Sequence, residues 1–154
     1  MHDAFSQDDP QSDTTSLTPP SRRERLRLAD SRFVRTPDGR CTAEVVLDWI
    51  DGNQFRGSSS GLSSPAVDLR VAAEAAIRAL HTFAKGELAF ELLGVKSIRA
   101  FDANVIIVSV AVKQGPGPQR LVGVCLVEND PVHGAVLAVL NATNRVLGNF
   151  IATK

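Results

Sequence analysis

An internal repeat constrains the fold of this chain more than any other feature of its sequence. Gly57 and Pro65 lead into an alanine-rich amphipathic segment, and Gly123 and Pro131 match them at an offset of 66 residues. The spacing of Gly, seven residues and Pro is the same in both copies. Matching spacing of this kind arises when one supersecondary unit occurs twice. We therefore predict one domain over residues 32–154, with repeat one over 32–86 and repeat two over 87–154.

Repeat one shows three strand signals followed by a helix signal. Residues 32–36 form a short predicted strand, and residues 42–50 alternate in polarity as a half-buried strand does. The turn Asp51-Gly52 indicates a hairpin that returns over residues 54–60. A helix then begins at Pro65, with Ser63 or Ser64 as its N-cap.

Repeat two follows the same order, with predicted strands over residues 104–113 and 120–128 and a helix that Asp130 caps and Pro131 opens. Before its hairpin loop, residues of repeat two lie 64 positions after their counterparts in repeat one, and beyond the loop they lie 66 positions after them. We therefore expect a two-residue insertion in that loop. Two such units predict an α+β fold. We expect a two-layer α/β sandwich of two βββα repeats with pseudo-twofold symmetry and a mostly antiparallel sheet.

Charge and composition separate the N-terminal region from the rest of the chain. Residues 1–21 are polar and acidic, and they contain too few apolar side chains to offset the entropy of ordering, so we predict a disordered tail. Residues 22–31 are rich in arginine and form either a basic linker or a short helix. The formal net charge of the whole chain is zero, which argues against nucleic acid as its partner.

The sequence contains no recognisable catalytic, metal or cofactor motif, so we expect no catalytic residue, no metal and no cofactor. Cys41 and Cys125 lie far apart without a CxxC pair, and we interpret both as reduced packing residues. No apolar run reaches the roughly 18 residues of a membrane helix, and no signal peptide is recognisable, so we expect a cytoplasmic protein without membrane contact. Arg35 with Asp38, and Arg99 with Asp102, are expected to form equivalent structural ion pairs.

The loop before the first helix is the strongest candidate binding site. Its hydroxyls and backbone N–H groups lie beside a helix N-terminus, whose partial positive charge favours an anion such as a carboxylate or phosphate. The alternative is a solvated connection with one capping serine. The candidate residues, with their counterparts in repeat two, are Ser58, Ser59, Ser60, Gly61, Ser63, Ser64, Asn129, Asp130 and His133.

The duplicated βββα order and the loop Gly61-Leu62-Ser63-Ser64-Pro65-Ala66-Val67-Asp68 carry a resemblance to a known family. They resemble the C-terminal regulatory and dimerisation domain of 2-isopropylmalate synthase and citramalate synthase, over roughly residues 32–150 and without the catalytic barrel. The resemblance implies a free-standing module that forms a homodimer, binds an amino acid or keto acid effector, and regulates a partner enzyme.

Two other functions remain open from the sequence. Residues 104–113 and 120–128 are apolar on both faces, which favours a central position or a face covered by another subunit, and hence a purely structural homo-oligomerisation domain. The other is nucleic-acid binding through the N-terminal arginine-rich arm, because an arginine-rich helix before three strands and a second helix would match the order of a double-stranded RNA binding domain. The start of the second helix lacks the lysines with which that fold binds phosphates.

Overall fold

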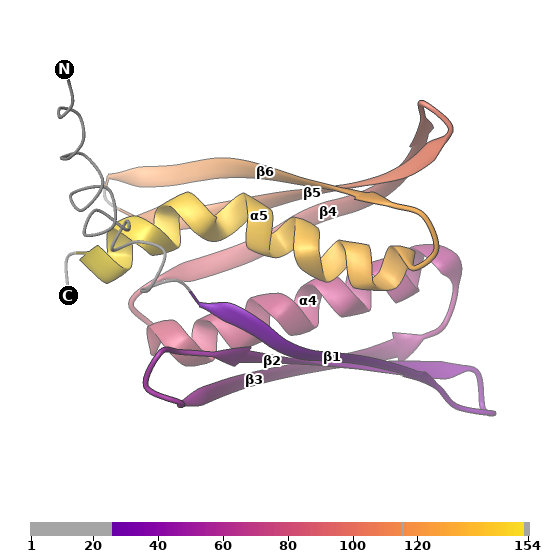
Figure 1. Cartoon of the computed structure of the whole chain (residues 1–154), viewed down its shortest axis with the longest axis horizontal. Coiled ribbons are helices and arrows are strands. Elements are labelled where there is room, and N and C mark those ends of the chain that lie inside the picture. Colours follow the sequence, from indigo (N-terminus) through magenta and orange to yellow (C-terminus); the bar gives the residue numbers. More distant parts are fainter. Residues whose placement is uncertain (1–25, 115, 153–154) are drawn as a thin grey trace, which may run out of the picture.

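The computed structural model describes residues 26–114 and 116–152, which form two copies of a βββα unit (Figure 1). In the first copy, strands β1, β2 and β3 span Arg27–Arg35, Arg40–Asp48 and Gln54–Leu62, and helix α4 spans Pro65–Ala84. In the second, strands β4, β5 and β6 span Ala89–Ala100, Ala103–Gln114 and Gly117–Val127, and helix α5 spans Pro131–Ala152. The predicted α+β fold of two βββα repeats is confirmed.

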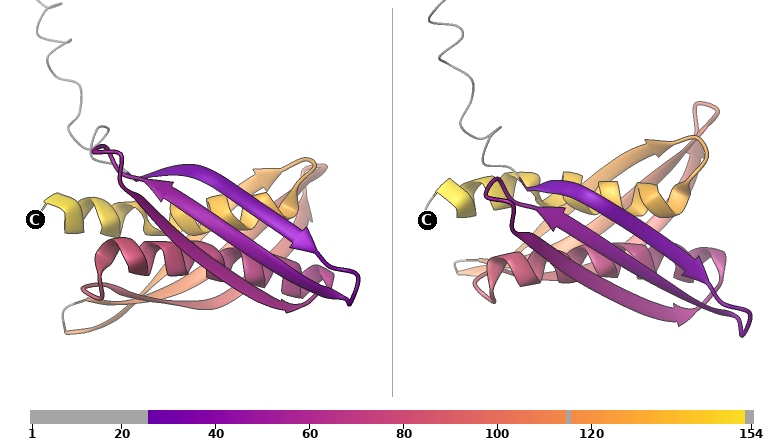
Figure 2. Two further views of the ribbon diagram at one scale, coloured as in Figure 1. Left: turned by 90° about the horizontal axis from the view of Figure 1, so that it is seen from below. Right: turned by 60° about the horizontal axis from the view of Figure 1, so that its bottom comes forward.

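Each repeat contributes one antiparallel sheet of three strands with its second strand in the centre. We call these sheets sheet A (β1-β2-β3) and sheet B (β4-β5-β6). Helix α4 packs on β2 and β3, and α5 packs on β5 and β6, so each repeat forms two layers. The repeats join through their helices, and both helices lie between the two sheets (Figures 1 and 2). The core is therefore a continuous apolar layer between sheet A and sheet B.

The glycines of the repeat signature allow a strand and a helix to approach each other closely. A methyl group added at Gly57 would overlap the backbone of Ala75 and Ala79 in α4. A methyl group added at Gly123 would overlap the backbone of Ala138 and that of the next turn of α5. Alanines on the facing helix surface complete this contact, because a larger side chain there would push the strand away. Packing thus explains much of the Gly-to-Pro spacing.

Strand pairing corrects the predicted alignment of the repeats. Ser31, Val45 and Gly57 lie opposite one another in sheet A, and Val95, Val108 and Gly123 lie opposite one another in sheet B. The offset between the repeats is therefore 64 residues from β1 to β4, 63 from β2 to β5 and 66 from β3 to β6. The β4–β5 turn is one residue shorter than its counterpart, and the β5–β6 hairpin carries three extra residues where we expected two.

The beginning of β1 also differs from the prediction. Residues 27–31 of the expected linker or short helix belong to β1, which pairs with β2 from Arg27 onward. Leu28 points toward the core, and this pairing favours strand over helix at these residues. Residues 22–25 and the predicted disordered tail, 1–21, lie outside the described residues.

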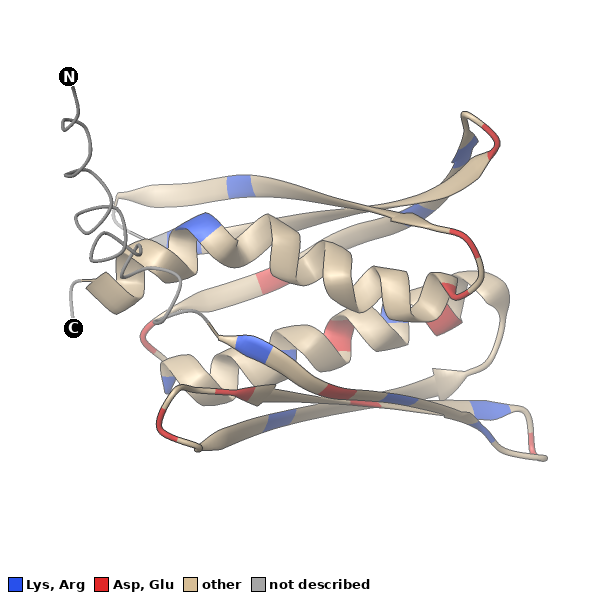
Figure 3. Ribbon diagram, viewed as in Figure 1, with Lys and Arg blue, Asp and Glu red and all other residues tan. Residues whose placement is uncertain are grey.

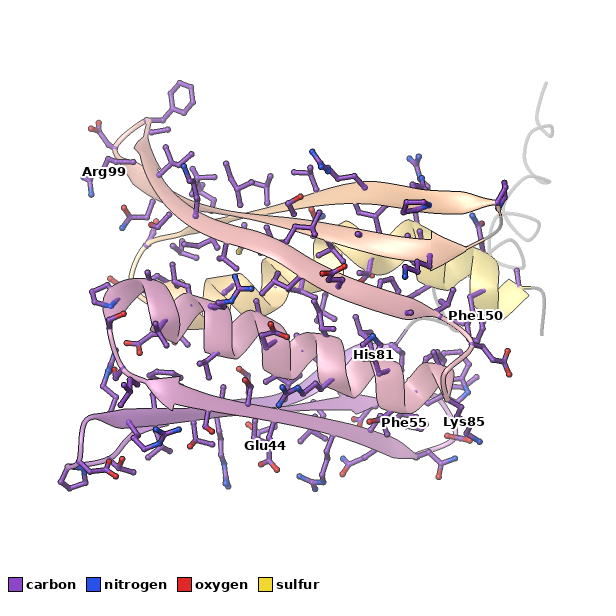
Figure 4. All side chains as sticks on the ribbon, turned by 180° about the vertical axis from the view of Figure 1, so that it is seen from behind. Glu44, Phe55, His81, Lys85, Arg99 and Phe150 are labelled. Carbon is purple, nitrogen blue, oxygen red and sulfur yellow. The ribbon has the colours of Figure 1, made fainter. Side chains whose placement is uncertain are left out.

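The outer faces of the two sheets differ in polarity. On the central strand of sheet A, Thr42, Glu44 and Asp48 point away from the helices, whereas Val105 and Ile107 do so on sheet B. Charged residues are correspondingly denser along sheet A (Figure 3), and Glu44 extends from its outer side (Figure 4). The central strand of sheet A thus has the more polar outer side, as suits a solvated sheet, whereas on sheet B the outward polar side chains Glu91, Lys96 and Arg120 lie on the edge strands.

Helix α5 is long and apolar enough to cross a membrane by length and composition, which the search for apolar runs in the sequence missed. Half of the relevant window is buried inside the fold, against β5, β6 and α4. Helix α5 therefore has the burial of a core helix.

Candidate functional site

A buried carboxylate in the first turn of α4 is the centre of the candidate site. Ser64 caps the helix by accepting a 3.2 Å hydrogen bond from the Val67 N–H, and Pro65 opens it. Asp68 follows in this first turn and is only 4% exposed. A buried acid is costly unless charged or polar partners surround it.

Asp68 has such partners from two other segments. Arg35 donates two hydrogen bonds to Asp68 Oδ2, at 3.2 Å from Nε and 2.7 Å from Nη2. Ser63 Oγ donates a 2.7 Å hydrogen bond to Oδ1. The Cys41 thiol completes this group, since it is near enough to the same carboxylate for each to shift the pKa of the other. We call Arg35, Cys41, Ser63 and Asp68 the Asp68 cluster.

The hydrogen bonds determine the ionisation of the Asp68 cluster. Burial alone would raise the pKa of Asp68, but the hydrogen bonds from Ser63 and Arg35 outweigh burial and lower that pKa below 3.8. Asp68 is therefore a carboxylate at neutral pH. Burial, followed by the neighbouring Asp68, raises the pKa of Cys41 above 9.0, so Cys41 is a protonated thiol and a poor nucleophile.

Repeat two has no equivalent of this cluster. The counterpart of Asp68 is Gly134, and the counterpart of Gly61 is Val127. A methyl group at Gly134 would overlap the Val127 side chain and lie 3.2 Å from Ile106 Cγ1. In repeat two the Val127 side chain thus occupies the place where a side chain on Gly134 would begin.

Two clefts open beside the Asp68 cluster, and both include Arg35, Pro131 and Val132 in their walls. The α4 cleft has a volume of about 410 Å³, and the α5 cleft has a volume of about 480 Å³. The α4 cleft is completed by Ser63, Ser64, Pro65, Asp68, Leu69 and Ser97. The α5 cleft is completed by Ser31, Phe33, Asn129, Asp130 and His133. The clefts therefore meet at Arg35 and at the N-terminal ends of α4 and α5.

The side chain of Arg35 is exposed at this meeting point despite its buried partner. It is 61% exposed, whereas the side chain of Asp68 is 5% exposed. Its guanidinium carbon lies 5.0 Å from the centre of the Phe33 ring. A cation fixed by a buried acid and an aromatic face is held in one orientation, so little further entropy is lost when it binds an anion.

Five of the predicted site residues lie in these clefts. Ser63 and Ser64 line the α4 cleft; Asn129, Asp130 and His133 line the α5 cleft. Asp130 caps α5 as predicted, because its Oδ1 accepts a 3.0 Å hydrogen bond from the His133 N–H. The structure thus brings residues from both repeats around Arg35.

The other four predicted residues do not line either cleft. Ser58, Ser59, Ser60 and Gly61 belong to β3, which continues through the serines to Leu62. Ser58 and Ser60 point to the outer face of sheet A, and Ser59 and Gly61 point toward α4. The expected loop is therefore only two residues long, because pairing with β2 orders the serines.

The predicted ion pairs of the two arginines are wrong. Arg35 pairs with Asp68, while Asp38 instead accepts hydrogen bonds from Thr36 and from the Arg40 N–H. Arg99 lies at the far end of sheet B (Figure 4), and no ion pair joins it to Asp102 within the described part of the chain. Sequence reasoning missed Asp68, although it sits on the buried stripe with Ala72, Ala75 and Ala79. An acid in such a stripe signals a buried partner.

The two clefts offer groups that can bind a ligand, namely a guanidinium, carboxylates and the N-terminal ends of two helices. No group of three or more His, Cys, Asp or Glu side chains that suits a metal ion occurs among residues 26–114 and 116–152. Compared with models of protein families and with curated proteins, the chain matches none. The site must therefore be interpreted from its own chemistry.

Proposed function

We propose that this chain is a non-catalytic regulatory module that binds an α-amino acid or a 2-keto acid in the two clefts around Arg35. One observation carries the proposal, namely the exposed guanidinium of Arg35, which Asp68 holds between the N-terminal ends of two helices. Both ligand classes contain a carboxylate, the anion that a guanidinium and helix N-termini favour.

Arg35 retains hydrogen-bond donors for such a carboxylate. A guanidinium has five N–H groups, and Asp68 accepts from Nε and Nη2. The remaining N–H groups belong to the exposed side of a side chain that lines both clefts. A ligand carboxylate bound there would also lie near the first turns of α4 and α5.

Asp130 supplies the group that distinguishes the two ligand classes. It lies in the α5 cleft with Arg35, so one cleft contains both a cation and an acid. An α-amino acid carries a carboxylate and an ammonium group and can pair with both. A 2-keto acid has no ammonium group, and its binding would depend on Arg35 alone.

The apolar walls of the clefts suit the rest of a small ligand. Leu69, Val132 and two prolines line the α4 cleft, and Phe33 lines the α5 cleft. Volumes of 410 and 480 Å³ lie in the range of small-molecule sites, which is roughly 300–1,000 Å³. Cytoplasmic location and a partner enzyme that responds to the ligand are part of the same proposal.

A thermal-shift screen of amino acids and 2-keto acids, followed by calorimetric titration of the hits, tests the proposal. A ligand at about 100 times its Kd should stabilise the fold by about 2.7 kcal/mol. The variant Arg35→Gln should abolish this shift. Its matched control, Arg32→Gln on the opposite face of β1, should retain it.

The variant Asp130→Asn separates the two ligand classes, because it removes the acid and keeps a capping side chain. It should weaken the binding of amino acids and leave the binding of keto acids unchanged. If no ligand in the screen stabilises the wild-type protein, the proposal is wrong.

A further inference from the structure

A separate cavity lies at the opposite end of the two helices from Arg35. We call it the aromatic pocket; its volume is about 390 Å³, and its walls include the rings of Trp49, Phe55, Phe83 and Phe150. The sequence has seven phenylalanines, one tryptophan and no tyrosine, so half of these rings meet in this one pocket. Phe55 and Phe150 mark its position in Figure 4.

Phe83 is the centre of this group of rings. Its ring centroid lies 5.5 Å from that of Trp49, 5.2 Å from that of Phe55 and 6.3 Å from that of Phe150. The planes are inclined by 48°, 81° and 72°, so the rings border the pocket from different directions. Trp49, Phe55 and Phe83 are only half-buried. Because the face of an aromatic ring carries partial negative charge, such walls attract a cation with an apolar surface.

The charged side chains around the aromatic pocket also favour a cation. Asp51 and Glu87 supply two carboxylates and Lys85 supplies one ammonium group, which gives a net formal charge of −1. Asp51 is held in place by Asn53, whose backbone N–H donates a 2.9 Å hydrogen bond to Oδ1 and whose Nδ2 donates a 2.7 Å hydrogen bond to Oδ2. Each carboxylate oxygen has a second lone pair, so Asp51 can still pair with a cation.

Both helices end at this pocket. Ala84 is the last residue of α4, Lys85 is its C-cap, and Phe150 lies in the last turn of α5. Since the N-terminal ends of both helices line the α4 cleft, α4 and α5 run in the same direction (Figure 1). Their C-terminal partial negative charges therefore add at the aromatic pocket. The last turn of α5, as far as the structure describes it, has no basic side chain to offset this charge.

The aromatic walls select the kind of cation. A metal ion needs several oxygen or nitrogen ligands, which rings do not supply. A primary ammonium group is a strongly hydrated point charge and loses that hydration among rings. A quaternary ammonium group donates no hydrogen bond and spreads its charge over methyl groups, so it suits aromatic walls best.

We propose that the aromatic pocket binds a small molecule with a quaternary ammonium group, such as choline, with the charged head against Trp49, Phe55 and Phe83 and with Asp51 at its edge. This site is separate from the clefts around Arg35, and its ligand needs no carboxylate. The proposal is therefore independent of the amino acid or keto acid proposed for those clefts.

The fluorescence of Trp49 tests the proposal directly, because Trp49 is the only tryptophan of the chain and there is no tyrosine. Choline chloride is titrated into the full-length protein, with sodium chloride at the same ionic strength as the control. Choline should change the fluorescence saturably, and sodium chloride should not. Dimethylbutanol, in which carbon replaces the ammonium nitrogen of choline, should bind at least about tenfold more weakly, because it lacks the charge.

Variants of the pocket assign the binding to its rings and charges. Phe55→Leu should weaken choline binding by about tenfold, because it removes one ring and keeps an apolar side chain. Its matched control, Phe101→Leu, should leave binding unchanged, since Phe101 is 98% exposed in the β4–β5 turn. Asp51→Asn should weaken binding, and Lys85→Gln should strengthen it by removing a like charge.

Circular dichroism checks that each variant is folded, and the exposed positions of Asp51 and Lys85 keep the test decisive if Phe55→Leu is not. The proposal is overturned if choline gives no saturable change, or if dimethylbutanol binds as tightly as choline. It is also overturned if choline binding is the same in the wild-type protein and in all folded variants of the pocket.

Discussion

The two repeats share a backbone arrangement and differ in what they place inside it. Gly57 and Gly123 bring β3 and β6 against the backbones of α4 and α5 in the same way. At equivalent positions in the first turns of α4 and α5, repeat one has Asp68 and repeat two has Gly134. The comparison shows that close strand–helix packing is the conserved requirement of the unit, while the polarity of the end of the helix varies.

The outer faces of the two sheets also differ in polarity. Repeat one is polar at the Asp68 cluster and polar on the outer face of sheet A. Repeat two has Gly134 and the apolar Val127 at the positions equivalent to Asp68 and Gly61, and exposes Val122, Val124 and Leu126 on the outer face of sheet B. The buried acid that anchors Arg35 is therefore a feature of repeat one alone.

Substitution of the packing glycines should have the largest effect on stability. Gly57→Ala and Gly123→Ala should each lower the free energy of unfolding by about 3 kcal/mol or more, because the added methyl group overlaps the helix backbone. Gly148→Ala is the control, since nothing lies within 4 Å of its added methyl group. It should raise stability by up to about 1 kcal/mol through helix propensity. Urea denaturation measures the free energy of unfolding of all three variants. If Gly57→Ala or Gly123→Ala lowers it by less than a typical surface substitution does, the shared close contact is refuted.

Giving repeat one the interior residues of repeat two should have the next largest effect on the free energy of unfolding. Asp68→Gly should cost about 3 kcal/mol, because it removes a buried ion pair and adds a glycine to a helix. Adding Gly61→Val should lower stability further, because a Cβ at this position lies 3.3 Å from Val67 Cγ1 and 3.4 Å from Val71 Cγ2. Urea denaturation measures both variants. A double variant more stable than Asp68→Gly would mean that a valine at this position can replace the carboxylate, as in repeat two.

Acid should weaken repeat one through the Asp68 cluster. The folded state lowers the pKa of Asp68 below 3.8, so its contribution to stability is complete above the unfolded pKa. The contribution is lost as the pH falls through the lower folded pKa. Asp68→Asn should therefore be less stable than the wild-type protein at pH 7 and should approach it below pH 3.8. Denaturation curves over this pH range check the sign, and parallel pH profiles of the two proteins would contradict it.

The ion pair on the outer face of sheet A should have the smallest effect. Arg56 Nη1 lies 3.6 Å from Glu44 Oε2, and both side chains are substantially solvated. Arg56→Ala should change the free energy of unfolding by less than about 0.5 kcal/mol, as exposed ion pairs do. Urea denaturation measures the change, and a loss above about 1 kcal/mol would contradict the solvation of this pair.

The sequence was sufficient for the features that local interactions determine. Ser64, Pro65 and Asp130 mark helix starts through capping and backbone geometry, and the Gly-to-Pro spacing marks the repeat. These signals predicted the order of all eight described elements. They also identified five residues of the clefts, because the N-terminal ends of α4 and α5 are themselves local features.

The remainder depends on pairing between distant residues. Arg35 and Asp68 are 33 positions apart in the sequence. The spacing favours the nearer Asp38 as the partner of Arg35, but Asp38 accepts hydrogen bonds from Thr36 and the Arg40 backbone instead. The strand over residues 54–60 was predicted, but its continuation through Gly61 and Leu62, which leaves only a two-residue loop before α4, comes from pairing with β2. Neither effect follows from spacing along the chain.

An NMR titration tests the central claim, ligand binding at Arg35, most directly. The protein labelled with ¹⁵N is titrated with each hit of the ligand screen while the Arg35 Nε–H resonance and the backbone resonances of residues 63–68 and 129–133 are followed. The account predicts saturable shifts of these resonances, with the hairpin between β2 and β3, at the opposite end of sheet A from Arg35, unaffected. Saturable shifts that leave Arg35 and both helix N-termini unchanged would contradict it.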